Sequence, residues 1–256
     1  MIHRINAMLA ALEQCEFIPD EDVAWVAVSS SDIKLIPGEI FRCPVRFVDC
    51  VKYHGAIDVA NSKRISNPGC FASGMQSLLR PIKSVLTHYP IVAAGISGYT
   101  AGGKSAISKQ KSHPQPHKMT NITRVHTHAN EVRFRSGIPN ELIFMPAVGS
   151  FAEGQVISIP LARHQLTIPI EYAYQHFVDY YHNNPLVVVL DEAPKSICPD
   201  ELIDKDRIRI CVAEFENHVV LHAWYSNLNF GAAGSVARII DKIAEERATN
   251  GLRIAR

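Results

Sequence analysis

Apolar residues fall into short runs along this chain, separated by polar segments rich in glycine or proline. Valine-rich runs at residues 22–30 and 45–51 predict buried strands, and the apolar spacing over residues 4–15 predicts an amphipathic helix before them. A helix followed by strands with short connections indicates an α/β layer at the front of the chain.

The second half of the chain has more strand patterns than helix patterns. We expect strands at residues 91–99, 142–149, 156–161, 186–190, 207–214 and 219–225, a helix at residues 170–183, and a hairpin turn at Glu216-Asn217. This content predicts an α+β domain with a mixed or antiparallel sheet. We expect the last four strands to share one sheet that helices cover on one face.

Composition and charge exclude several classes of protein. The chain has 256 residues, 47% of them hydrophobic, and its 26 Lys and Arg nearly balance its 25 Asp and Glu, so no net charge favours nucleic acid or a membrane surface. We find no apolar run of membrane-spanning length and no signal-peptide pattern, and we expect a cytoplasmic protein. The six cysteines form no CxxC pair, which argues against a zinc ribbon or a disulfide framework.

The turn that ends in Cys70 is the strongest candidate for chemistry. Gly69 is expected to permit an unusual backbone angle, and the apolar run over residues 71–79 predicts a helix that begins at the cysteine. The N–H groups of a first helical turn favour a thiolate and lower its pKa, and they can also hold an oxyanion. The alternative is that Cys70 is a small buried hydrophobic residue.

A glycine-rich segment follows the strand at residues 91–99. Gly102, Gly103 and Lys104 offer backbone N–H groups beside an ammonium group, which suits a phosphate or a carboxylate, although a solvated loop is the alternative. The polar stretch at residues 108–121 predicts a mobile surface loop that orders over a ligand.

Residues 120–128 alternate in the manner of a strand, which would place His126 and His128 on one face with Glu131 a little further on. A histidine held by a carboxylate is a common partner for a thiol nucleophile. A metal site at the His-x-His pair is the alternative, without an evident third ligand. Near the C-terminus, small residues from Asn229 open a helix that runs to about Arg247, and they suit close approach of either a ligand or another backbone.

Five of these stretches occur in the order found in the N-acetyl-gamma-glutamyl-phosphate reductases, and the chain resembles the shorter type of that enzyme. They are residues 66–71, 97–104, 126–131, 144–149 and 227–234. The resemblance covers residues 65–244. It implies an oxidoreductase of arginine biosynthesis that uses NADPH to reduce an acyl phosphate to a semialdehyde, with an α+β catalytic domain after a Rossmann domain.

The resemblance also implies residue roles. Cys70 would attack the acyl phosphate and form a thioester, His128 would be the acid/base, and Glu131 would hold His128. Assigned in the same way are substrate-binding Asn67, His126 and Lys104 and cofactor-binding Gly102, Gly103, Asn229, Gly231 and Gly234. Asn130 stands where the family has a proline.

The front of the chain departs from the family further. Residues 22–51 resemble the last strands of a Rossmann domain, but no glycine-rich first βα unit precedes Asp22, so we expect weak NADPH binding or none, and an impaired reductase. We expect three parts: residues 1–66 as the remnant of a dinucleotide-binding domain, 67–226 as an α+β catalytic and dimerisation domain, and 227–256 as a helix that returns to the nucleotide side.

Three functional interpretations stay open at this point. The first is the reductase, which the family implies to be a homo-oligomer, a dimer or a tetramer, paired through an exposed sheet face. The second is a short paralogue that acts as a binding or structural subunit. The third is a cysteine acyl-transfer enzyme without hydride transfer.

Overall fold

The computed structural model describes residues 25–27, 46–47, 64–66, 69–122, 126–201, 204–231, 234–235 and 238. They belong to two compact units, one made of Met1–Pro68 and Ala232–Arg256 and the other of Gly69–Gly231. The expected helix at residues 4–15 lies outside the described residues, as does most of the expected C-terminal helix.

The first unit contains a small parallel sheet. Its strands β1 (Trp25–Ala27), β2 (Arg46–Phe47) and β3 (Arg64–Ser66) run in the order β1-β3-β2, with both neighbours parallel to β3. The strands predicted at residues 22–30 and 45–51 are confirmed at the residues that the structure describes there, and the parallel pairing is typical of an α/β layer.

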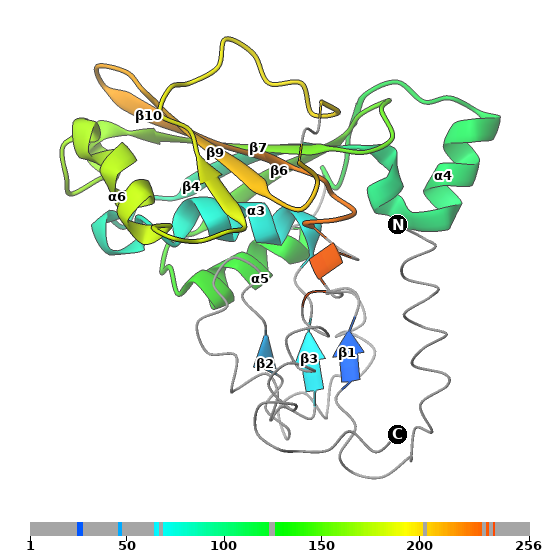
Figure 1. The fold of residues 1–256 in the computed structure, drawn as a ribbon, viewed down its shortest axis with the longest axis horizontal. Coiled ribbons are helices and arrows are strands. Elements are labelled where there is room, and N and C mark those ends of the chain that lie inside the picture. Colours follow the sequence, from blue (N-terminus) through cyan, green and yellow to red (C-terminus); the bar gives the residue numbers. More distant parts are fainter. Residues whose placement is uncertain are drawn as a thin grey trace. The chain divides into compact units, whose positions relative to one another are not determined.

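The second unit is built on a seven-stranded mixed sheet in the order β5-β6-β4-β7-β10-β9-β8 (Figure 1). The strands are β4 (Ile91–Ser97), β5 (Lys118–Met119), β6 (Leu142–Val148), β7 (Gln155–Ala162), β8 (Val187–Val189), β9 (Ile208–Glu214) and β10 (His218–Tyr225). The helices are α3 (Cys70–Leu79), α4 (Gly103–Ser112), α5 (Thr127–Ser136) and α6 (Ala173–Tyr180), with 3₁₀ turns η2 (Lys83–Val85), η3 (Tyr99–Gly102), η4 (Arg163–Gln165) and η5 (Ile170–Tyr172).

The strand pairing confirms the predicted α+β class. Strands β4 and β6 are parallel, as are β8 and β9, and the other neighbours are antiparallel. The last four predicted strands correspond to β7, β8, β9 and β10 of this one sheet, and the β9–β10 hairpin turns at Glu216-Asn217 as expected.

Helices α3 and α5 cover one face of the sheet (Figure 1). On β4, Ile91 and Ala93 are buried on this face, and at Gly95 the ring of Phe71 from α3 takes the room of a side chain, since a Cβ there would lie 2.7 Å from it. On the opposite face, which we call the open face, apolar side chains are partly or largely exposed. The open face includes Val92, Ala94, Ile143, Met145 and Pro160.

The helix that carries the cysteine is buried and is tied to its surroundings at two carbonyl groups. Every residue of α3 after Cys70 is buried. Tyr225 donates a hydrogen bond to the carbonyl of Cys70 at 2.6 Å, and Tyr181 donates one to the carbonyl of Ser77 at 2.7 Å. Two hydroxyl groups therefore fix α3 at points about two turns apart.

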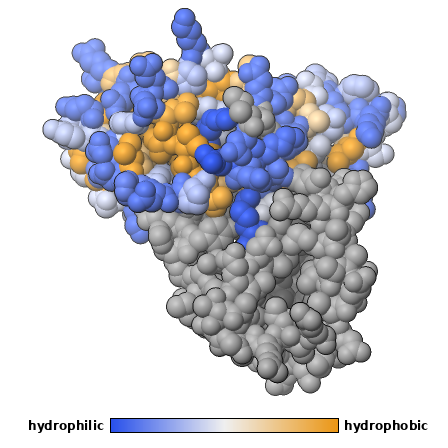
Figure 2. Space-filling model, in the orientation of Figure 1, coloured by the Kyte–Doolittle hydropathy of each residue, from blue (hydrophilic) through white to orange (hydrophobic). Residues whose placement is uncertain are grey.

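Two sequence predictions about the middle of the chain are wrong over part of their length. The stretch at residues 108–121 is a loop at residues 113–117, as expected, but its first residues form the end of α4, and Lys118–Met119 form β5. The residues of α4 are all exposed or partly exposed, so that its polarity marks a solvated helix (Figure 2). The stretch at residues 120–128, expected as a strand, leads into α5 at Thr127. Within the described part of the chain, no helix is both long and apolar enough to cross a bilayer.

Candidate active site

Gly69 and Cys70 form the start of α3, as the sequence predicts, but for a different reason. Gly69 has φ −63° and ψ 152°, an extended backbone that any residue adopts, so the expected unusual angle is absent. A Cβ on Gly69 would lie 2.1 Å from Nε2 of His128. The glycine is therefore required by space, because the imidazole lies directly against the residue before Cys70.

His128 and His126 come together at the start of α5. His126 is the N-cap, and its Nδ1 accepts a hydrogen bond from the His128 N–H at 3.1 Å. The two ring centroids are 4.5 Å apart, and Phe71 contacts both rings at 6.3 Å and 6.1 Å. Burial lowers the pKa of His128 to about 3, and the neighbouring His126 contributes to this shift as a second cause. The ring of His128 is therefore neutral at pH 7.

Glu131 lies one turn after His128 and binds the cysteine turn. Its Oε1 accepts a hydrogen bond from the Gly69 N–H at 3.2 Å. Nδ1 of His128 has no hydrogen-bond partner among the residues that the structure describes, so the carboxylate does not hold the histidine at that nitrogen. The expected pairing of Glu131 with His128 is thus replaced, at Nδ1, by a contact that fixes the turn before Cys70.

The pKa of the Cys70 thiol is raised, whereas the sequence predicts that it is lowered. Burial raises its pKa to about 11, against the N–H groups of Phe71 and Cys70, which lower it, and the charge of Glu131 adds a further rise. The N–H groups at the start of the helix act in the expected direction, but the loss of water outweighs them. Near neutral pH the site therefore holds a neutral thiol beside a neutral imidazole.

With the thiol protonated and the imidazole neutral, attack by the sulfur requires proton transfer to a base. A neutral imidazole can accept the thiol proton as the sulfur attacks a carbonyl carbon. The same N–H groups that face the sulfur are placed to stabilise an oxyanion. Among the described residues, no group of three or more His, Cys, Asp or Glu is arranged to hold a metal ion.

Residues 70–227 match the family model described as semialdehyde dehydrogenase, dimerisation domain. The chain belongs to the semialdehyde dehydrogenase family. The match begins at Cys70 itself, so the cysteine and both histidines lie within the matched residues.

Curated relatives of this chain carry a more specific name. The N-acetyl-gamma-glutamyl-phosphate reductase of Rhizobium meliloti (strain 1021) is 30% identical over an alignment of 200 positions, which covers 72% of this chain and 64% of that protein. The chain thus spans less than two thirds of the length of this relative. The reductase of the same name from Burkholderia lata is 25% identical over 261 residues, covering 90% of this chain and 83% of that protein.

The fold is shared with solved structures of the family. Aspartate semialdehyde dehydrogenase II from Vibrio cholerae, in complex with ASA, superimposes with a TM-score of 0.63 at 12% sequence identity, over 88% of this chain and 80% of that chain.

The structure places the remaining predicted site residues on other elements. Gly102, Gly103 and Lys104 are exposed at the junction of η3 and α4, where Gly103 has a positive φ of 72°. Asn229 and Gly231 lie in the loop after β10. Gly234 belongs to the other compact unit, and Asn67 lies outside the described residues.

Gly231 has a packing role. A Cβ on Gly231 would lie 2.9 Å from the Cβ of Cys70 and 3.0 Å from the carbonyl oxygen of Asn227. The loop after β10 therefore lies directly against the cysteine. Gly231 of this motif allows close backbone approach to Cys70, which was one of the two alternatives that the sequence left open.

Sequence reasoning missed the polar residues that join the loops around the site. Asn227 accepts a hydrogen bond from the Gly154 N–H at 2.7 Å and donates one to Thr100 at 3.0 Å. Ser226 bonds Glu153, which pairs with Lys205 at 2.7 Å. Asn227 is the first residue of the stretch 227–234 that the sequence did indicate, and Ser226 directly precedes it, so this position was the available signal.

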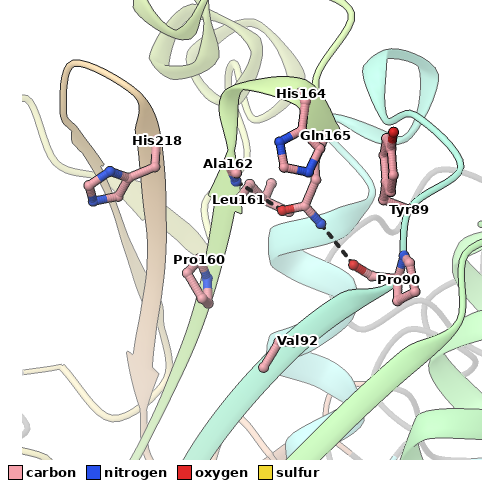
Figure 3. A pocket seen from close by; sticks show the side chains of 9 residues that line it. All are labelled: Tyr89, Pro90, Val92, Pro160, Leu161, Ala162, His164, Gln165 and His218. Carbon is pink, nitrogen blue, oxygen red and sulfur yellow. Dashed lines mark hydrogen bonds between the residues drawn. The ribbon is translucent and has the colours of Figure 1, made fainter.

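A cavity of about 460 Å³ lies at the other end of the sheet (Figure 3). It is lined by residues that include Tyr89, Val92, Pro160 and His218, and Gln165 closes one side through a hydrogen bond to the carbonyl of Pro90 at 2.8 Å. It opens beside the first residues of β4, whereas the cysteine lies near the last, roughly 20 Å away along the strands. The cavity is therefore separate from the thiol chemistry.

Proposed function

We propose that this chain carries the thiol chemistry of an N-acetyl-gamma-glutamyl-phosphate reductase, which reduces that acyl phosphate to the semialdehyde in arginine biosynthesis. One observation carries the proposal: the imidazole of His128 fills the room of a side chain on Gly69, immediately before Cys70 at the start of α3. The names of the curated relatives supply the substrate.

The first step is acyl transfer to sulfur. The Cys70 thiol attacks the acyl carbonyl carbon, its proton passes to His128, and the carbon–oxygen bond to phosphate breaks. A carbon–sulfur bond forms, inorganic phosphate leaves, and the product is a thioester on Cys70. The N–H groups of Cys70 and Phe71 face the sulfur and would stabilise the oxyanion formed during this attack.

Glu131, His128 and His126 have separate roles in this proposal. Glu131 fixes the Gly69 N–H and thereby the entry to α3. His128 is the acid/base, and it returns a proton when the product leaves the sulfur. His126 supports His128 by capping α5, and we assign it to the binding of the substrate.

The cofactor enters as part of the proposal. NADPH, when bound, supplies the hydride that reduces the thioester to the semialdehyde. The exposed start of α4 fits an anionic group, because Gly102 and Gly103 leave its backbone open, Lys104 adds a positive charge, and the helix has no acidic residue. We assign Lys104 to the substrate phosphate, and Gly102, Gly103, Asn229, Gly231 and Gly234 to the cofactor side.

The reverse reaction tests this function most conveniently, because the semialdehyde is more stable than the acyl phosphate. The purified chain, N-acetylglutamate semialdehyde, inorganic phosphate and NADP⁺ should give NADPH absorbance, and Cys70→Ser should abolish it. If the wild-type chain never reduces NADP⁺ but acquires an acyl group on Cys70 when it is mixed with N-acetyl-gamma-glutamyl phosphate, the acyl-transfer alternative replaces the reductase. No acylation and no reduction would favour the non-catalytic subunit.

We also propose that two copies of the chain pair through the open face. The matching family model is described as a dimerisation domain. On the open face, Ile143 and Met145 of β6 are 45% and 42% exposed, beside Val92 and Ala94 of β4. A sheet face with such side chains is expected to be covered by a partner.

A further inference from the structure

Tyr225 connects the end of β10 to the backbone of the proposed nucleophile. Its hydroxyl donates to the carbonyl of Cys70 at 2.6 Å and accepts a hydrogen bond from Nε2 of Gln155 at the start of β7. Tyr225 is 1% exposed and Gln155 is fully buried. Because the amide can only donate through Nε2, the hydroxyl proton is directed to the Cys70 carbonyl. The hydrogen bonds therefore run in one direction, from Gln155 to Tyr225 and from Tyr225 to Cys70.

The packing around this hydroxyl leaves it little freedom. A Cβ on Gly74 of α3 would lie 2.3 Å from the Tyr225 oxygen, so the glycine admits the hydroxyl to the first turn of the helix. Phe230 contacts the tyrosine ring with centroids 5.2 Å apart. On another side of the cysteine, Gly231 lies against its Cβ. The backbone of Cys70 is thus held from two directions.

We propose that Tyr225, supported by Gln155, is a positioning residue for the Cys70 nucleophile. The part of this proposal that concerns turnover rests on the proposed function, whereas the part that concerns thiol reactivity does not. Cys70 is the first residue of its helix, where the backbone has fewer helical hydrogen bonds than in the interior. A buried hydrogen bond to its carbonyl fixes the sulfur relative to the N–H groups that stabilise negative charge.

The consequence of losing this bond follows from geometry. Displacement of a reacting group by about 1 Å can reduce a rate by about 100-fold. In Tyr225→Phe the carbonyl of Cys70 loses its side-chain donor, the first turn loosens, and the N–H groups of Cys70 and Phe71 are less well aimed at the sulfur. We expect alkylation of Cys70 by iodoacetamide at about pH 8 to slow by about 5- to 10-fold, with its pH profile moved to higher pH.

The same helix provides a matched control. Tyr181 is also a buried tyrosine, and its hydroxyl donates to the carbonyl of Ser77 at 2.7 Å. Tyr181→Phe removes an equivalent hydrogen bond about two turns from the cysteine. It should lower the midpoint of thermal unfolding by an amount similar to Tyr225→Phe, but leave the alkylation profile of Cys70 within about twofold of the wild type.

A double variant separates positioning from stability. Tyr225→Phe alone leaves the Gln155 amide buried without its acceptor, whereas Gln155→Met with Tyr225→Phe replaces both polar partners by apolar groups. We expect the double variant to regain most of the lost unfolding midpoint but not the alkylation rate. If reductase activity is present, kcat should fall by about 10- to 100-fold in both variants, with KM changed by less than about threefold.

The outcomes distinguish the two proposals. If the alkylation profile recovers together with stability in the double variant, or if Tyr181→Phe moves it as far as Tyr225→Phe, then Tyr225 is merely structural and the positioning proposal is overturned. An unchanged profile in Tyr225→Phe overturns it as well. Because alkylation requires neither substrate nor NADPH, these results hold even if the wild-type chain has no reductase activity.

Discussion

Gly69 has a hydrogen atom where other residues have a Cβ, and the ring of His128 occupies the space that this Cβ would fill. The backbone there tolerates any side chain, so a substitution acts through space alone. Gly69→Ala should displace His128 from the cysteine and reduce turnover by at least about 100-fold, since general acid/base catalysis contributes about that much or more. Steady-state kinetics measures this loss. Gly137→Ala, at the C-cap of α5 where the Cβ meets no atom within 4 Å, is the control, and it should cost stability but little turnover.

The pKa of Cys70 gives a second prediction at this scale. With a pKa of about 11, the thiolate fraction rises about tenfold per pH unit up to that value, so the alkylation rate should climb from about pH 7 to about pH 10 without levelling. Site-specific alkylation measured by peptide mass spectrometry checks the profile. A plateau near pH 8 would show that the thiol is not held neutral by burial.

Glu131→Gln tests the origin of part of that shift. The variant keeps an acceptor for the Gly69 N–H but removes the negative charge that raises the pKa of the Cys70 thiol. The pKa should fall, and alkylation at about pH 8 should become about two- to fivefold faster, because the carboxylate is the smallest of the contributions. A slower reaction would mean that Glu131 acts mainly by fixing the turn.

Among the elements, α5 depends on its first cap. His126 accepts a hydrogen bond from the His128 N–H, so His126→Ala should lower the free energy of unfolding by about 1 kcal/mol. His126→Asn keeps an N-cap acceptor and should retain most of this stability. Thermal unfolding measures both.

Turnover then identifies the acid/base. His128→Asn should lower kcat by about two to four orders of magnitude, while His126→Asn should retain most of it. The opposite order of these two variants would assign the acid/base to His126.

The elements also show which features a sequence can reveal. The apolar run after Cys70 predicted α3 correctly, because a fully buried helix has an unambiguous pattern. The start of α5 was predicted as a strand, because residues 120–128 alternate between polar and apolar positions. His126 caps the helix there, and no periodicity indicates such a cap. The polar helix α4 was misjudged as a loop, because a solvated helix lacks an apolar stripe.

The candidate site was predictable only in part, for related reasons. Cys70, His128 and Glu131 were indicated by motif, and the structure brings them together through Gly69. The balance between burial and the helix N-terminus at Cys70 was not predictable, because it depends on packing from distant parts of the chain. Tyr225 gave no signal, since a tyrosine at the end of a strand is common and its hydrogen bond spans 155 residues.

For the whole molecule, the open face carries the prediction about assembly. We expect a dimer or a tetramer at micromolar concentration, and Met145→Lys should weaken it, because a charge would be buried in the interface. Ile122→Lys, at an apolar side chain 81% exposed and outside the sheet, is the matched control and should leave assembly unchanged. Sedimentation velocity measures both. A wild-type chain that is strictly monomeric would contradict the proposed interface. The nucleotide-binding role of residues 1–66 is a separate prediction that this experiment does not address.

Trapping of the thioester tests the central claim most directly. The chain is mixed with N-acetyl-gamma-glutamyl phosphate without NADPH, stopped in acid and examined by intact and peptide mass spectrometry. We predict one acyl group per chain, on the peptide that contains Cys70, released by hydroxylamine, absent in Cys70→Ser and slow to form in His128→Asn. An acyl group on Cys198 or Cys211 instead, or no acylation of a folded chain that binds the substrate, would contradict the assignment of Cys70 as the nucleophile.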